Sequence, residues 1–150
     1  MNYAEQRAVA FEALLARLAA ECGIARPTAA TLDESARGHE LLAVLYTGEA
    51  ARSPESWDVC VVLPDLLGSF AGIAGAILDP AESALAAARF GVDKLPALVL
   101  LRRGEYVGVV EGMRDWRPFV EEFGALLSSP TQPPPVAGQY PAQRIATRSA

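Results

Sequence analysis

Few side chains in the sequence suit covalent or metal chemistry. The chain has two cysteines, Cys22 and Cys60, and a single histidine, His39. The cysteines form no C-x-x-C pair, so the sequence predicts neither a disulfide framework nor a zinc site. His39 follows Gly38 in an expected loop and offers one base at most, without a Ser/His or Cys/His arrangement. We therefore expect no catalytic residue, no metal site and no cofactor.

Both cysteines are expected to be small buried hydrophobes. Cys60 lies in the apolar run VCVVL, and Cys22 follows the apolar positions of an amphipathic helix. An alternative remains for Cys60, because a thiol in the first turn of a helix can have a lowered pKa. The sequence therefore leaves a thiol reaction through Cys60 as a second hypothesis.

Composition and charge restrict the class of protein. The chain has 150 residues, of which 51% are hydrophobic, which suits one domain with a sizeable core. Its acidic balance argues against nucleic acid and anionic membranes and is compatible with a basic partner. No apolar run approaches the roughly 18 to 20 residues of a spanning helix, and the charged amino terminus does not resemble a signal peptide. We expect a cytoplasmic protein without membrane insertion.

Periodicity and capping signals predict an alternation of helices and strands. The expected elements are a helix over 3–22, a short helix after the capping box Thr31–Glu34, a strand over 41–47, an ambiguous segment over 57–70, a strand over 71–78, a helix over 79–91, strands over 97–102 and 106–111 that turn at 103–105, and a helix capped by Asp115 that runs to about Leu127. The strand over 41–47 is continuously apolar, as expected for a strand covered on both faces. The helix over 79–91 is expected to have Asp79 as its N-cap, with Glu82 closing a capping box. Residues 129–150 are rich in proline and poor in apolar groups, so we expect a disordered tail after a domain over 1–128.

Pro96 opens an expected strand, although proline cannot donate a hydrogen bond to a sheet. The segment RFGVDKLPALVLLRRGEYVGVVEGMRDWRPFVEEFGALL, 89–127, resembles the second half of a thioredoxin. The resemblance implies an α/β, thioredoxin-like fold with a central mixed β-sheet flanked by helices and a C-terminal β-hairpin and helix. It also implies a cis Leu95–Pro96 bond that turns the backbone groups of Leu95 outward, where an extended peptide can pair with them. Alternatively, Pro96 lies in a turn beside an edge strand.

The redox centre of a thioredoxin is missing. Counting back from Pro64, which resembles the kinking proline of the thioredoxin helix, places Ser56 and Val59 at the two cysteine positions. The preceding strand, LLAVLYT, also lacks the buried acid that thioredoxins use beside their thiols. Dithiol exchange requires an attacking and a resolving thiol, so we expect no thioredoxin activity.

A narrower resemblance covers residues 41–127. The segments SPESWDVCVVLPDLLGSFAG and RFGVDKLPALVLLRRGEYVGVVEGMRDW together are similar to hydrogenase expression/formation accessory proteins of the HupG/HyaE type, which are thioredoxin-like and lack the dithiol. The resemblance implies a noncatalytic, chaperone-like role in maturation of a nickel-iron uptake hydrogenase. The implied partner is the small-subunit precursor with its twin-arginine signal peptide, and other accessory proteins are further candidates.

A twin-arginine segment presents two guanidinium groups beside an apolar run, so its receptor needs carboxylates next to an apolar groove. In a thioredoxin-like arrangement, four acids cluster near the Leu95–Pro96 turn, and two tryptophans are available to stack on arginine. The predicted binding residues are Glu49, Glu55, Trp57, Asp58, Asp65, Leu95, Pro96 and Trp116. The four acids and Trp116 have ordinary alternatives: Asp58 as a helix N-cap, the other acids as solvated charges and Trp116 as packing. Trp57 is the strongest candidate, because a large aromatic in an expected polar loop must pack or bind. A scaffold that joins other maturation factors is a third hypothesis.

Overall fold

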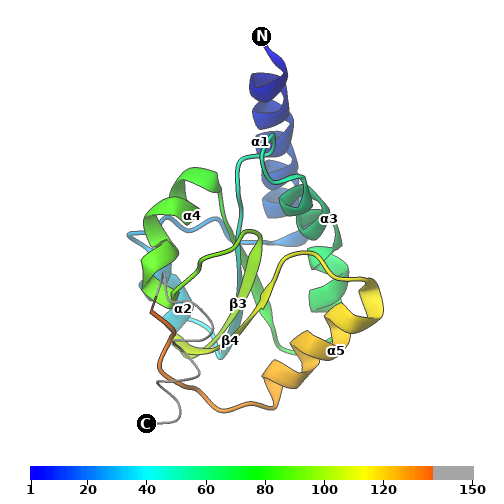
Figure 1. Ribbon diagram of the computed structural model, residues 1–150. Helices are drawn as coiled ribbons and strands as arrows, with labels where there is room; N and C mark the ends of the chain where they lie inside the picture. The colour runs from blue at the N-terminus through cyan, green and yellow to red at the C-terminus, as the bar shows by residue number, and fades with distance from the viewer. Residues whose placement is uncertain (137–150) are drawn as a thin grey trace.

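The computed structural model describes residues 1–136 (Figure 1). Its elements follow the predicted alternation and are, in chain order, α1 (Tyr3–Cys22), α2 (Leu32–Arg37), β1 (Leu41–Tyr46), α3 (Pro54–Gly68), β2 (Ala74–Leu78), α4 (Pro80–Ala86), the 3-10 turn η1 (Ala87–Phe90), β3 (Ala97–Arg102), β4 (Glu105–Glu111) and α5 (Trp116–Leu127).

The four strands form one mixed sheet in the order β2-β1-β3-β4. β1 pairs with β2 in parallel and with β3 in antiparallel, and β3 and β4 form the predicted hairpin. The register aligns Tyr46 with Leu78 and with Ala97, and Ala97 with Glu111. The ends of β1, β2 and β4 therefore meet the start of β3 at one edge, which we call the Pro96 edge.

Helices cover both faces of the sheet, with α1, α3 and α5 on one side and α2 and α4 on the other (Figure 1). Side chains of β1 alternate between the two cores: Ala43 and Leu45 face the first group of helices, and Leu42, Val44 and Tyr46 face the second. All five are fully buried. The continuously apolar run of β1 thus reflects burial on both faces, as predicted.

The segment that the sequence left ambiguous is the helix α3, and it begins earlier than expected. Pro54 occupies the first helical turn after the N-cap Ser53, a position that suits proline because the N–H there has no partner within the helix. The expected cap, Asp58, lies inside the helix, so its role as an N-cap is wrong. Trp57, expected in a polar loop, is also helical.

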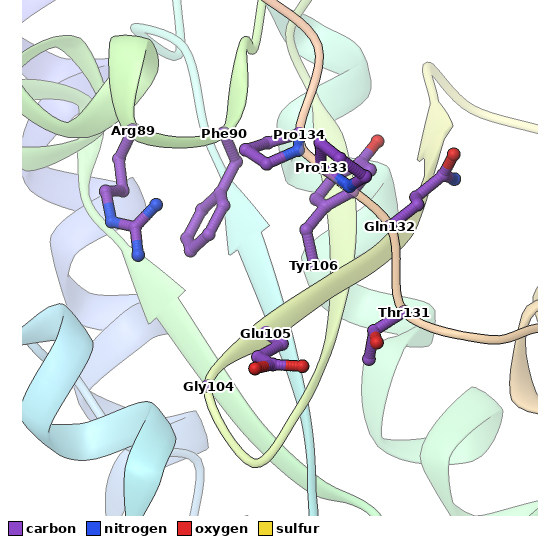
Figure 2. A pocket seen from close by; sticks show the side chains of 9 residues that line it. All are labelled: Arg89, Phe90, Gly104, Glu105, Tyr106, Thr131, Gln132, Pro133 and Pro134. Carbon is purple, nitrogen blue, oxygen red and sulfur yellow. The ribbon is translucent and has the colours of Figure 1, made fainter.

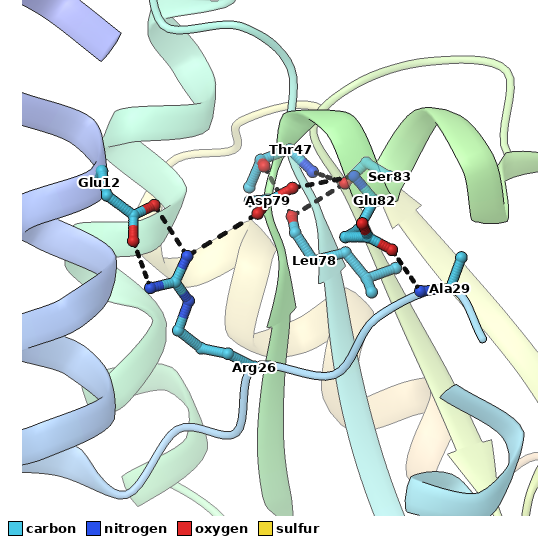
Figure 3. A network of polar contacts seen from close by, with 8 residues as sticks. All are labelled: Glu12, Arg26, Ala29, Thr47, Leu78, Asp79, Glu82 and Ser83. Atoms are coloured by element: carbon cyan, nitrogen blue, oxygen red, sulfur yellow. Dashed lines mark hydrogen bonds and ion pairs between the residues drawn. The ribbon is translucent and has the colours of Figure 1, made fainter. Parts of the chain in front are cut away.

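The start of α4 confirms the predicted N-cap. The Asp79 carboxylate accepts a hydrogen bond from the Glu82 backbone N–H at 2.9 Å. Glu82 does not close a capping box, because its own carboxylate accepts from the Ala29 N–H at 2.7 Å. It ties the loop after α1 to α4 instead (Figure 3).

The end of α1 corrects the expectation for Cys22, which is exposed. The buried positions Phe11, Leu14, Leu15 and Leu18 follow helical spacing. The same spacing continues to Cys22, but the helix ends there and the chain turns at Gly23. Ile24 then enters the core in its place.

The hairpin turns at two residues, Arg103 and Gly104, which both have positive φ angles (52° and 84°). That conformation is typical of the turn that matches the twist of paired strands, and it lets Glu105 begin β4 rather than belong to the turn.

Residues 129–136 have no regular secondary structure, yet they lie against the hairpin; we call this segment the strap. The Gln132 backbone N–H donates to the Tyr106 carbonyl at 2.8 Å, and its side-chain Nε2 donates to the Val107 carbonyl at 2.9 Å. The Arg102 guanidinium donates to the carbonyls of Leu127 and Ser129. The first part of the predicted tail thus covers the edge strand β4, whereas residues 137–150 lie outside the described residues.

Candidate functional site

The Leu95–Pro96 peptide bond is cis, as the resemblance to thioredoxin implies. The Pro96 carbonyl accepts a hydrogen bond from the Gly112 N–H at 2.7 Å, which joins the start of β3 to the end of β4. Among residues 1–136, neither backbone polar group of Leu95 has a hydrogen-bond partner. The Leu95 side chain is 42% exposed. This position thus presents a free donor, a free acceptor and an apolar side chain.

Glu55 lies at the same place. Its Oε2 atom accepts a hydrogen bond from the Met113 N–H at 3.3 Å, one residue after the Gly112 that bonds to Pro96. Because Glu55 belongs to the first turn of α3, this bond brings the start of that helix beside the loop after β4. Three of the predicted residues, Glu55, Leu95 and Pro96, therefore meet at the Pro96 edge.

Close packing of the loop after β1 supports this arrangement. A Cβ atom at Gly48 would lie 2.8 Å from the Ser53 Cβ, so the loop packs this closely against Ser53 only because residue 48 is glycine. The same Cβ would be in ordinary van der Waals contact with the Leu95 Cδ1, at 3.5 Å, so this part of the loop lies beside Leu95. The fully buried Ser56 hydroxyl accepts a hydrogen bond from the Gly48 N–H at 2.9 Å and forms a second hydrogen bond with the Ser53 hydroxyl at 2.7 Å. These hydrogen bonds hold the loop against the start of α3.

The positions expected for a dithiol hold no sulfur. Ser56, in the first turn of α3, is hydrogen-bonded to the loop just described, and Val59 lies on the buried face of α3. Cys60, one residue further, is fully buried, and burial raises the pKa of its thiol to about 12. A thiol in that state is neutral at physiological pH and inaccessible to a substrate, so the structure gives no support to thiol exchange through Cys60.

Asp58 and Asp65 lie on the exposed face of α3, one and three turns into the helix. Val61, between them, is 51% exposed. The spacing of 58, 61 and 65 places all three side chains on one side of the helix. Neither aspartate forms an ion pair with any residue between 1 and 136. This face therefore offers two free carboxylates around an apolar side chain.

The other three predicted residues have different surroundings. Trp57 is half-buried: its ring contacts Phe11 of α1, with centroids 6.0 Å apart, and the Arg7 guanidinium lies 4.9 Å from the ring centroid. It therefore packs α3 against α1 and already has an arginine partner. Trp116, at the start of α5, is 47% exposed. Glu49 lies on the side of α1 and α4, away from the Glu55 contact with Met113.

Buried hydroxyls anchor the Pro96 edge from the other face. The Thr47 N–H donates to the Ser83 hydroxyl at 2.8 Å, and both hydroxyl groups donate to the Leu78 carbonyl (Figure 3). These bonds join the ends of β1 and β2 to α4. Sequence reasoning missed Gly48, Ser53, Ser56 and Thr47, and the only available signal was the strand-to-helix loop that contains most of them.

A separate cavity of about 390 Å³ lies between η1, the hairpin and the strap (Figure 2). Its walls include Arg89, Phe90 and Tyr106, with the two aromatic rings stacked at 6.1 Å. Arg89 is paired with Asp33 at 3.0 Å. The strap itself closes one side of this cavity through Gln132 and its neighbouring prolines.

The described residues have neither a cluster of metal ligands nor a helix that could span a membrane. Between residues 1 and 136 no three His, Cys, Asp or Glu side chains come together as metal ligands. None of the helices in that range has the length and hydropathy needed to cross a membrane.

These features define a thioredoxin-like domain whose cis-proline edge remains while its dithiol is replaced. Comparison with solved structures shows the same fold: a mutant thioredoxin from Halobacterium salinarum matches with a TM-score of 0.57 at 20% identity, over 68% of this chain and 88% of that one. The family model described as hydrogenase-1 expression protein HyaE matches residues 14–119. The chain belongs to this family.

Two relatives are similar over much of the domain. The hydrogenase expression/formation protein HoxO of Cupriavidus necator is 38% identical over 111 residues, which cover 72% of this chain and 69% of the relative. The hydrogenase expression/formation protein HupG of Rhizobium leguminosarum bv. viciae is 43% identical over 86 residues, which cover 57% of this chain and 58% of the relative. The matched region thus spans little more than half of the latter protein.

Proposed function

We propose that this protein is a noncatalytic, chaperone-like accessory factor that binds the twin-arginine signal peptide of a nickel-iron uptake hydrogenase small subunit before export. Such a factor acts in the cytoplasm, where the precursor is made. By holding the signal peptide, it delays export until the small subunit is folded and its cofactors are inserted.

Family membership supports the connection with hydrogenase. Membership of the HyaE family implies a role in hydrogenase maturation, and the relatives described above are named as hydrogenase expression/formation proteins. Their names do not specify a ligand, so the choice of the signal peptide depends on the chemistry of the site.

The observation that carries peptide binding is the state of Leu95. Its N–H and C=O are both without a partner in the described residues, and its side chain is exposed beside a cis-proline. An extended peptide can pair with such a backbone through main-chain hydrogen bonds and place an apolar side chain against Leu95.

The charges beside Leu95 favour a basic peptide. Glu55 lies at the same edge, and Asp58 and Asp65 continue along the exposed face of α3 without an ion partner among residues 1–136. Carboxylates bind guanidinium groups through paired hydrogen bonds, so two neighbouring arginines fit this surface better than a neutral peptide does. Trp116 is exposed and available to stack on one of them.

The test is a titration of the purified full-length protein with the signal peptide of the small subunit, followed by tryptophan fluorescence. A second peptide carries glutamine at both arginine positions. We expect saturable binding of the first peptide, weakened by salt, and little binding of the second. Equal binding of both peptides would exclude recognition of the arginines, and binding of neither would favour a scaffold that recognises folded partners.

Matched variants show which carboxylates contribute to peptide binding. The double change Asp58→Asn/Asp65→Asn should weaken binding about two- to thirtyfold, since exposed charge pairs contribute about 0.2–1 kcal/mol each. The control is Glu21→Gln/Glu34→Gln, which also removes two exposed charges but on α1 and α2, away from the Pro96 edge. An equal loss in both variants would mean that only the net charge matters.

A further inference from the structure

The structure contains a groove that, of the predicted binding residues, only Glu49 lines. It has a volume of about 480 Å³ and lies between the first half of α1, the loop after β1 and the start of α4. Its walls are mostly small: Ala4 and Ala8 of α1, Ala50 and Ala51 of the loop, and Ala81 and Ala84 of α4, with Phe11 among the larger lining residues. Because both helices present alanine here, their facing surfaces leave an open apolar channel.

The two walls of the groove are joined by Arg26. Its guanidinium donates to both Glu12 oxygens at 2.6 and 2.8 Å, and it lies 3.9 Å from the Asp79 carboxylate (Figure 3). Glu12 belongs to α1 and Asp79 caps α4, so this arginine bridges the helices on either side. The groove is therefore formed before any ligand binds.

The rim of the groove differs from its walls. Three acids, Glu12, Glu49 and Asp79, lie at the cavity. Arg26 already forms ion pairs with Glu12 and Asp79. Glu49 has only a loose contact with Arg52, at 3.8 Å between two exposed side chains, so its charge is free to meet a basic ligand. Leu85, next to Ala84, is 72% exposed and extends the apolar surface of α4 beyond the groove.

The groove and the Leu95 position share one edge of the sheet. The loop that contains Glu49 follows Tyr46 of β1, Pro80 follows Leu78 of β2 by two residues, and Pro96 precedes Ala97 of β3. The register aligns these three strand ends. One ligand can thus contact Leu95 with one part and the groove with another.

We propose that the α1–α4 groove binds the apolar segment of the signal peptide, while its arginine pair faces Glu55 and Asp58. This inference rests on the function proposed above and adds a second subsite to it. The occupant is an apolar segment flanked by basic residues, because the walls are apolar and the negative rim charge of Glu49 has only the loose, exposed contact with Arg52. It also gives a role to Glu49, which lies apart from the other predicted acids.

The experiment compares two ligands on three proteins. The ligands are the complete signal peptide and a short peptide that contains the arginines without the apolar segment. The proteins are the wild type, Ala84→Trp, which fills the groove, and Ala16→Trp, which places the same side chain on an exposed position of α1 outside it. We expect Ala84→Trp to weaken binding of the complete peptide about tenfold, because the tryptophan side chain excludes the apolar side chains of the peptide from the groove. Binding of the short peptide should stay unchanged, as should both affinities of Ala16→Trp.

A measurement on the wild type makes the result independent of the variants. Amide NMR signals of Ala8, Ala50 and Ala84 should shift with the complete peptide and not with the short one. If the complete peptide binds, but these signals do not shift and Ala84→Trp does not weaken binding, the groove proposal is overturned and the proposal of peptide binding stands. If the wild type binds neither peptide, the proposed function fails and the groove proposal fails with it. Concentration-dependent dimerisation lost in Ala84→Trp would assign the groove to a second copy of the chain.

Discussion

At the scale of single residues, the two cysteines have opposite surroundings. Cys60 lies on the buried face of α3, where burial raises the pKa of its thiol, whereas Cys22 is exposed at the end of α1. The sequence placed both in the core, because each continues an apolar pattern. Only the turn after Gly23 removes Cys22 from the core, so its exposure follows from where the helix ends.

Thiol titration of the native protein should detect one reactive cysteine. We expect a disulfide reagent to modify Cys22 quickly and Cys60 only after unfolding, because the buried thiol is neutral and inaccessible. In the Cys22→Ser variant, the native protein should show no fast reaction. A fast reaction that persists in this variant and disappears in Cys60→Ser would restore the redox hypothesis.

Ser56 provides a second prediction at this scale. Its hydroxyl satisfies the Gly48 N–H inside a buried loop, so Ser56→Ala leaves a buried donor without a partner. We expect the free energy of unfolding in urea to fall by about 1–3 kcal/mol, the cost of an unsatisfied buried group. Ser53→Ala serves as a control with a smaller effect, because Ser53 is only partly buried and does not bond to Gly48. Equal effects would show that the hydrogen bond between the two serines matters more than the one to Gly48.

At the scale of elements, the position of α1 depends on contacts with the loop that follows it and with α3. The Glu12–Arg26 pair joins the helix to this loop, and Trp57 packs on Phe11 from the other side. The Arg26 guanidinium, mainly through its hydrogen bonds, holds the pKa of Glu12 below its ordinary value of 4.5. A carboxylate with a depressed pKa in the folded state stabilises the fold above the unfolded pKa, and this contribution is lost as the pH falls through the folded one.

The Glu12→Gln variant should therefore show a pH-dependent loss of stability. At pH 7 we expect a loss of at most about 1 kcal/mol, because the pair is largely exposed to solvent. As the pH falls below about 4, the difference from the wild type should shrink, since Glu12 itself becomes protonated. Urea denaturation at pH 7 and at pH 3 measures both values, and a difference that does not change with pH would contradict the ion pair as its source.

At the scale of the whole molecule, the question is whether the stably folded domain ends at residue 128 or includes the strap, 129–136. The boundary predicted at residue 128 followed from the many prolines and few apolar groups of the next segment. The strap nevertheless forms hydrogen bonds with the hairpin: Gln132 donates to two carbonyls of β4, and the Ser129 carbonyl accepts from the Arg102 guanidinium. A Cβ atom at Gly91 would overlap the carbonyl of Pro135, so the strap also packs closely on the turn after η1.

Truncation tests the strap. A chain that ends at residue 136 should have the same free energy of unfolding as the full chain. A chain that ends at residue 128 should lose about 1–2 kcal/mol, since several hydrogen bonds of about 0.5–1.5 kcal/mol each are removed and the entropy of ordering the strap is regained. Urea denaturation of the three chains is the measurement. Equal stability of all three would support the boundary at residue 128.

The sequence by itself determined the features that depend on near neighbours: the alternation of helices and strands, the N-cap at Asp79, the absence of a thiol pair and the unusual proline before β3. Caps, turns and periodicity depend on residues that are close together in the sequence, so they can be recognised from the sequence alone. The tertiary structure decided which residues meet. Glu55 meets the Met113 N–H near Pro96 because the sheet register aligns the ends of β1, β3 and β4, whereas Glu49, six residues earlier, lies at the α1–α4 groove. Such proximity depends on strand order and loop packing between distant parts of the chain, and no local pattern records it.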